Sequence, residues 1–152
     1  PEPEALLTEF AVLPGLDGRK MSKSYGNCIY LSDPEEVVRE KVQGMFTDPR
    51  KLRKSDPGHP EECPVYAYHV AYSPEDAPQT KADCEAGKLG CVPHKRLLGD
   101  LLVKALTPHW QLRAEYAGRP GLLDEVLAEG ARRARTRTQA TMELVWQAMK
   151  LR

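Results

Sequence analysis

The chain has 152 residues, with 22 basic and 22 acidic side chains and a formal net charge of zero at pH 7. Its mean hydropathy of −0.54 and its 29% charged residues exclude a membrane protein, a disordered acidic tail and a collagen-like chain. The length fits one ordinary domain, or one domain with part of another, and we expect a globular protein of the cytoplasm.

Two short apolar runs lie near the start of the chain. The first, at residues 10–13, is too short to distinguish a strand from a helix, and the second, at residues 28–31, is β-prone. Residues 14–27 lie between them and are rich in glycine and serine, which predicts a loop.

A helix is expected directly after these runs. Asp33 can cap it, Pro34 fits the first helical position, and Glu36 completes an Asp-x-x-Glu capping pattern. Apolar side chains then follow on one helical face: Val38, Val42 and Met45. Residues 47–62 contain three prolines and are predicted to form a surface loop.

The rest of the chain is predicted to be mostly helical. A short helix is expected over residues 64–72, a loop-rich segment over 73–90, and a helix where leucines recur at residues 97–102. Thr107-Pro108 resembles a cap and a proline start, which predicts a separate helix to about residue 117. Three residues then break the chain: Gly118, Pro120 and Gly121.

Two further helical faces follow this break. They cover residues 122–127 and 131–150, and Gly130 between them is a predicted stop or kink.

The segment best suited to chemistry is the polar loop at residues 15–24, which we call the lysine loop. It reads Gly-Leu-Asp-Gly-Arg-Lys-Met-Ser-Lys-Ser, so that Lys20 and Lys23 stand among two serines. Two flexible ammonium groups can neutralise a triphosphate and then follow the charge that builds on departing pyrophosphate. Such contacts accelerate a reaction only if they strengthen in the transition state, which loop closure can provide. The alternative is a polar surface loop without a catalytic role.

The spelling of the lysine loop resembles a known signature. Five consecutive residues match the KMSKS motif of class I aminoacyl-tRNA synthetases: Lys20, Met21, Ser22, Lys23 and Ser24. Further segments, at residues 47–49, 63–66, 87–91 and 130–135, are similar to bacterial tryptophanyl-tRNA synthetases. The resemblance extends over nearly the whole chain. A part of a tyrosyl enzyme and a non-catalytic, synthetase-related module that binds RNA or protein are the alternatives.

The resemblance implies an activity that uses ATP and Mg to convert tryptophan to tryptophanyl-adenylate, and then transfers it to tRNA(Trp). Lys20 and Lys23 would be catalytic and contact the pyrophosphate part of ATP, with Met21, Ser22 and Ser24 completing the site. The family's HIGH motif and tryptophan pocket belong to its N-terminal half, and this sequence has no His-x-Gly-His element. We therefore expect the chain alone to be inactive, as part of an enzyme that works as a homodimer.

The resemblance also implies a mainly α fold with two domains. Residues 1–30 would be the C-terminal remnant of a Rossmann-type catalytic domain and would carry the lysine loop. Residues 31–152 would form a helical bundle of the kind that binds the tRNA anticodon.

Three of the four cysteines have a spacing that suggests a metal site. Cys63, Cys84, Cys91 and His94 follow the pattern C-x20-C-x6-C-x2-H, whose last step can bring two ligands onto one ion. Some tryptophanyl-tRNA synthetases carry a [4Fe-4S] cluster on cysteines that end in C-x6-C-x2-C, and here His94 replaces the last cysteine. A histidine-ligated cluster, a Cys3His zinc site and free thiols remain open. Cys28 is expected to be a buried thiol.

Basic side chains concentrate in the last third of the chain. Residues 104–152 carry nine basic and five acidic side chains. Four arginines cluster where the last helix is predicted to begin: Arg132, Arg133, Arg135 and Arg137. At a helix N-terminus these charges interact unfavourably with the helix dipole. Binding of tRNA phosphates would offset that cost. The alternative is salt bridging to nearby acidic residues: Glu125, Glu129 and Glu143.

Overall fold

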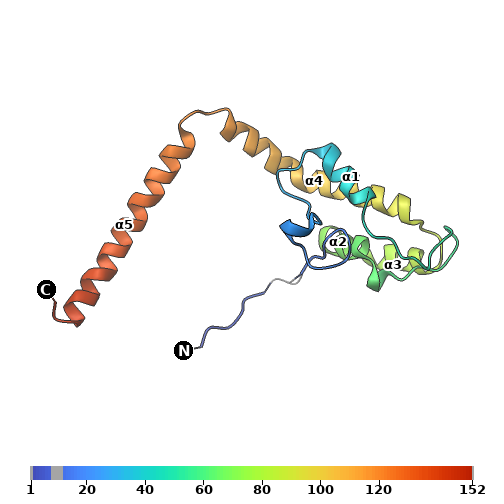
Figure 1. Cartoon of the computed structure of the whole chain (residues 1–152), viewed down its shortest axis with the longest axis horizontal. Coiled ribbons are helices and arrows are strands. Elements are labelled where there is room, and N and C mark those ends of the chain that lie inside the picture. The colour runs from blue at the N-terminus through green and yellow to red at the C-terminus, as the bar shows by residue number, and fades with distance from the viewer. Residues whose placement is uncertain (1, 8–11, 152) are drawn as a thin grey trace. The chain divides into compact units, whose positions relative to one another are not determined.

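The computed structural model describes residues 2–7 and 12–151, and within them the regular elements are helices (Figure 1). The only pairing of strand type in this part of the chain is an isolated antiparallel bridge between Pro14 and Lys20. The predicted mainly α fold is therefore confirmed. The β-prone residues 28–31 form no strand, because no neighbouring segment pairs with them. Residues 10 and 11 of the first apolar run lie outside the described residues.

The first helices follow the lysine loop. A short 3-10 helix, η1, covers Lys23–Tyr25, and α1 covers Glu35–Gln43. Pro34, not Asp33, occupies the cap position of α1, so the predicted cap is wrong. The Asp33 carboxylate instead accepts hydrogen bonds from the Tyr30 amide (2.8 Å) and the Lys41 ammonium (2.5 Å). Asp33 is thus used to fasten the segment before α1 to the body of that helix.

Two helices that pack together follow the long loop. The 3-10 helix η2 covers Pro60–Glu62 and leads into α2, Pro64–Tyr72, whose predicted bounds are confirmed. The predicted loop at 73–90 is wrong in part, because it contains α3, Ala77–Glu85. Proline in the first turn of α3 is compatible with a helix start, where its missing N–H has no helical partner to lose.

The last two helices are longer than predicted. α4, Cys91–Ala117, continues through Pro108, so the predicted break at Thr107 is wrong; the Thr107 hydroxyl donates to the Val103 carbonyl (2.7 Å). After the predicted turn at residues 118–121, α5 covers Leu122–Ala148 and passes through Gly130. One glycine costs a helix only about 1 kcal/mol, and the surrounding alanines and leucines favour helix enough to continue through it.

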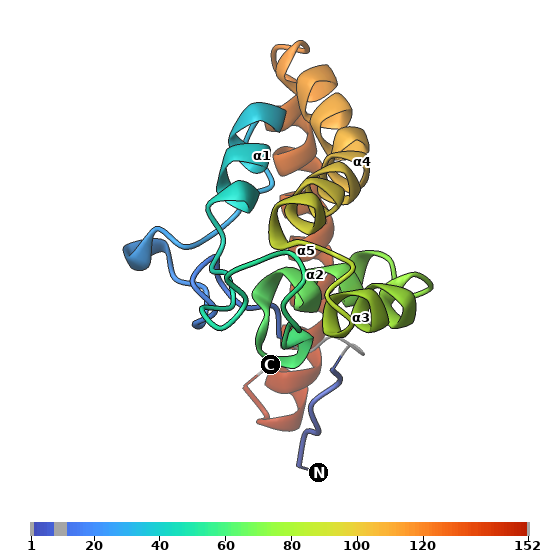
Figure 2. The ribbon, with the colours of Figure 1, turned by 90° about the vertical axis from the view of Figure 1, so that its right-hand side faces the viewer.

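The chain divides into two compact units, Pro1–Trp110 and Gln111–Arg152. In the first unit, α1, α2 and α4 surround one apolar core (Figure 2). Each helix contributes fully buried or nearly fully buried side chains, among them Val38, Tyr68 and Leu98. In the second unit, α5 has no buried residue among those described. The predicted domain boundary at residue 30 stays a prediction.

The core and the segment after α1 also hold the lysine loop, at its start and at Met21. Met21 and Ile29 are partly buried and pack against the core cluster. The Tyr68 hydroxyl donates to the Pro14 carbonyl (2.9 Å), and the Phe46 amide donates to the Leu16 carbonyl (2.7 Å). Residues downstream of the loop therefore fix where it starts and hold its middle against the core.

Candidate functional site

The lysine loop presents its two lysines to solvent. Lys20 and Lys23 are both exposed, and within residues 2–7 and 12–151 neither ammonium has a hydrogen-bond or ion-pair partner. Met21 between them turns inward to the core, and the hydroxyls of Ser22 and Ser24 bond to each other at 2.8 Å. Two uncommitted cations on an anchored loop form a site suited to a polyphosphate anion.

Asp17 supplies the negative charge inside the loop, but it is directed to other partners. It accepts hydrogen bonds from the Asn27 side chain (2.8 Å) and from Arg19, with which it also forms an ion pair (2.6 Å). These hydrogen bonds, that from Asn27 first, lower the pKa of Asp17 to about 2. Asp17 is therefore ionised at neutral pH without neutralising either lysine.

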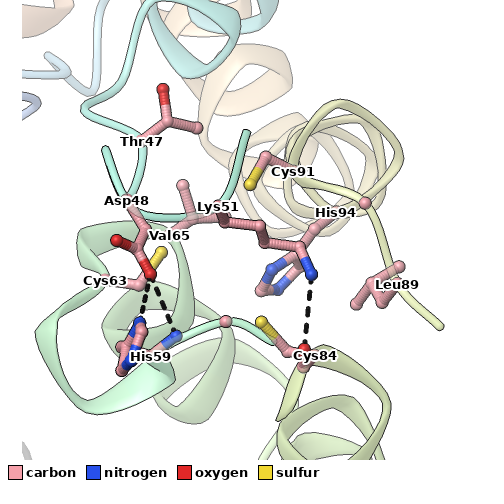
Figure 3. Close-up of a pocket in the computed structure, with 12 residues that line it drawn as sticks. Thr47, Asp48, Lys51, His59, Cys63, Val65, Cys84, Leu89, Cys91 and His94 are labelled. Carbon is pink, nitrogen blue, oxygen red and sulfur yellow. Dashed lines mark hydrogen bonds and ion pairs between the residues drawn. The ribbon is translucent and has the colours of Figure 1, made fainter. Parts of the chain in front are cut away.

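The predicted metal ligands come together from three helices. Cys63, at the start of α2, Cys84 of α3, and Cys91 and His94 of α4 all line one cavity of about 20 Å³ (Figure 3). Figure 3 shows the sulfur atoms of the three cysteines pointing towards the space that the side chain of Lys51 crosses. All four cysteines are free thiols, and Cys28 is buried as predicted. A cavity of this volume holds about one water-sized atom, far less than an eight-atom cluster.

The four side chains do not form a ligand shell as they stand. Among the described residues, no group of three His, Cys, Asp or Glu side chains is arranged to hold a metal ion. The Nε2 atom of His94 lies 3.3 Å from Nδ1 of His69, whose Nε2 in turn lies 3.2 Å from the Thr80 hydroxyl. Burial, and then the neighbouring His69, lower the pKa of His94 to about 4. His94 is thus a neutral, buried ring that is already hydrogen-bonded.

Burial also suppresses the reactivity of two of the thiols. Burial raises the pKa of Cys63. Burial also raises the pKa of Cys84, although the nearby Lys51 ammonium acts in the opposite direction. Without a metal, both side chains are therefore protonated at neutral pH and weakly nucleophilic.

Lys51 also lines this cavity, and no sequence pattern marks it as a site residue. It is only 8% exposed, and its ammonium donates to the carbonyls of Lys54, Asp56 and Cys84. These bonds join the loop before η2 to the end of α3. One lysine in a proline-rich loop gives no sequence signal for such a role, because its partners are backbone carbonyls.

The arginine cluster lies in the middle of α5, so the predicted placement at a helix N-terminus is wrong. Arg132 and Arg133 both form ion pairs with Glu129, the second at 3.7 Å. Within the described part of the chain, Arg135 and Arg137 have no ion-pair partner. The cluster therefore contains two arginines that are partly neutralised and two that are available to an anion.

The sequence and the fold both match known synthetases. The family model of tRNA synthetases class I (W and Y) matches residues 1–107. A tryptophan–tRNA ligase of Aquifex aeolicus is 49% identical over 99% of this chain and 39% of its own length. The corresponding ligase of Thermotoga maritima is 43% identical over 99% of this chain and 47% of its own length. The chain thus spans less than half the length of these relatives.

A solved structure supports the same assignment. The tryptophanyl-tRNA synthetase of Campylobacter jejuni, complexed with ADP and tryptophan, superposes with a TM-score of 0.80 at 28% identity. The match covers 97% of this chain and 46% of that one. In the described residues, no helix is long and apolar enough to cross a membrane. Because the family model covers more than half of its residues, this chain belongs to the class I tRNA synthetase (W and Y) family.

Proposed function

We propose that the chain is the KMSKS-bearing part of a tryptophan–tRNA ligase, which activates tryptophan with ATP and Mg and charges tRNA(Trp). The observation that carries this proposal is the lysine loop, where Lys20 and Lys23 are exposed and their ammonium groups have no hydrogen-bond or ion-pair partner in the described structure. The relatives named above are tryptophan–tRNA ligases, which favours the tryptophanyl over the tyrosyl alternative.

In this proposal the chain supplies only part of the active site. Lys20 and Lys23 bind the β- and γ-phosphates of ATP, and their attraction grows as negative charge develops on the leaving pyrophosphate. The hydroxyls of Ser22 and Ser24 provide further donors to the phosphates. The HIGH motif and the tryptophan pocket lie in residues outside this sequence. The complete enzyme acts as a homodimer in the cytoplasm.

The proposal assigns α5 to tRNA binding. Arg135 and Arg137 have no acidic partner in the described structure, so phosphate oxygens can reach them without displacing a carboxylate. Replacing both by glutamine in the complete protein should weaken tRNA(Trp) binding. It should also reduce the slope of log affinity against log salt by about 0.7–0.9 for each lost phosphate contact. Fluorescence anisotropy with labelled tRNA at several salt concentrations measures both quantities.

The matched control is the pair Arg132→Gln and Arg133→Gln on the same helix. These arginines already pair with Glu129, so their removal should change the affinity and the salt slope less. Equal affinity for wild type and R135Q/R137Q at low salt would exclude these two arginines from the tRNA contact.

A metal site is a separate part of the proposal. The convergence of three thiols from α2, α3 and α4 on one cavity supports it, and the cavity volume favours a single zinc ion over a [4Fe-4S] cluster. Cys63, Cys84 and Cys91 would be the ligands, with His94 as the fourth after release from His69. A bound zinc ion would hold these three helices together and would take no part in the reaction.

Metal analysis of protein purified with and without oxygen tests this part. We expect about one equivalent of zinc per chain, as a single Cys3His site requires, and no iron–sulfur absorption in the visible spectrum. Stoichiometric iron would favour the cluster instead. Protein that contains neither metal would show that the four side chains are a packed, metal-free cavity.

A further inference from the structure

Asn27 is buried directly behind the lysine loop, and its amide contacts the loop at three points. The side chain is 5% exposed. Its Oδ1 accepts a hydrogen bond from the Ser22 amide (2.8 Å), while its Nδ2 donates to the Asp17 carboxylate (2.8 Å) and the Lys20 carbonyl (3.1 Å). One side chain therefore bonds the loop before, at and after Lys20.

The main chain around Asn27 fixes this side chain in place. The Asn27 carbonyl accepts a hydrogen bond from the Leu16 amide (2.9 Å), and the Leu16 carbonyl accepts one from Phe46, just beyond α1. Gly15 leaves the space that the amide fills, because a Cβ atom there would lie 2.3 Å from Asn27 Nδ2. The loop, its glycine and Asn27 thus form one interlocked unit that is attached to the helical core.

We infer that Asn27 is a positioning residue for the ATP reaction. By bonding to Lys20 and Ser22, it sets the backbone conformation in which both lysine side chains extend to solvent and towards a triphosphate. This inference rests on the proposed function for the role of the lysines, but the loop-ordering part of it does not. Asn27 itself touches no substrate, since it lies beneath the loop.

The chemistry of the amide decides between a hydrogen-bonding role and simple space filling. Asparagine both donates and accepts, whereas an aspartate of the same size only accepts when ionised. Asn27→Asp would keep the bond from Ser22, lose the bond to the Lys20 carbonyl and place a second carboxylate against Asp17. That repulsion would disturb the loop in either case, so the variant that decides is Asn27→Leu, which keeps a similar volume and makes no side-chain hydrogen bond. If Asn27 only fills space, Asn27→Leu should be mild; if its hydrogen bonds position the loop, it should be as severe as Asn27→Ala.

Two measurements on the complete protein test the inference. In ATP–pyrophosphate exchange, we expect Asn27→Leu and Asn27→Ala to raise the KM for ATP about 10-fold, while the KM for tryptophan stays within about 2-fold. In limited trypsin digestion, we expect faster cleavage after Arg19, Lys20 and Lys23, with the sites identified by mass spectrometry. Thr80→Val is the control: it removes a buried hydrogen bond, to His69 Nε2, far along the chain from the loop and should change neither.

The two readouts separate the inference from the proposed function. If the wild-type complete protein catalyses no exchange but the Asn27 variants are cleaved faster than it is, the loop-ordering role is supported and the proposed function is overturned. An active protein in which Asn27→Leu and Asn27→Ala alter neither the KM for ATP nor the cleavage would overturn the inference. Equal effects of the Asn27 variants and Thr80→Val would overturn it as well, because they would reflect general destabilisation.

Discussion

Replacing Lys20 and Lys23 together by methionine is expected to slow ATP–pyrophosphate exchange by the complete protein about 10³-fold. Both ammonium groups are exposed, and neither has a partner within the described residues, so their removal breaks no hydrogen bond or ion pair there. What is lost is attraction to the charge that grows on pyrophosphate as its bond to the adenylate breaks. The effect should therefore fall mainly on kcat, with a smaller rise in the KM for ATP.

The control for this variant is Lys88→Met, which removes an exposed lysine from the segment between α3 and α4. It should leave exchange unchanged, and circular dichroism should be the same for both variants. A double lysine variant that exchanges pyrophosphate at the wild-type rate would remove the lysine loop from the reaction. The proposed function would then lose the observation that carries it.

Leu98→Ala is expected to lower the free energy of unfolding by about 2–5 kcal/mol. Leu98 is fully buried on α4 and belongs to the core cluster shared with α1 and α2. Truncation loses its apolar contacts and leaves a cavity that rigid helices on either side cannot fill. For a chain of this size, each kcal/mol lowers the melting temperature by roughly 2–4 °C, which thermal unfolding followed by circular dichroism measures.

The neighbouring Leu97→Ala is a matched control, because Leu97 is 49% exposed on the same helix. Its truncation should cost well under about 1 kcal/mol, since a half-exposed side chain loses less apolar burial and leaves no cavity. Similar losses in the two variants would mean that α4 does not face the core as described.

The success and failure of the helix predictions have particular physical causes. Residues 64–72 were predicted correctly because proline starts the helix and the apolar residues that follow share a face. α3 is as long as the helix at 64–72, but it was missed because it carries few apolar residues to reveal its period. Pro108 and Gly130 were wrongly predicted to end helices. Each has a low helix propensity, but the favourable residues on both sides of it within α4 or α5 outweigh that one unfavourable position.

The candidate site was predicted unevenly for similar reasons. The five residues of the signature are contiguous, so the sequence alone identified them. Asn27 and Lys51 were missed because their partners are backbone groups or residues brought close by folding. His94 was predicted as a metal ligand from its spacing, whereas folding gave it another partner, His69, which lies 25 positions earlier in the chain.

By itself, the sequence determined the mainly α fold and the lysine loop with its family signature. These features depend on local periodicity or on contiguous residues, which a linear pattern contains. Only the tertiary structure decided that the ammonium groups of Lys20 and Lys23 have no partner in the described residues, that Asn27 holds their loop and that Arg135 and Arg137 differ from their neighbours. Each of these depends on which side chains packing brings within hydrogen-bonding or ion-pairing distance, and spacing along the chain does not specify that.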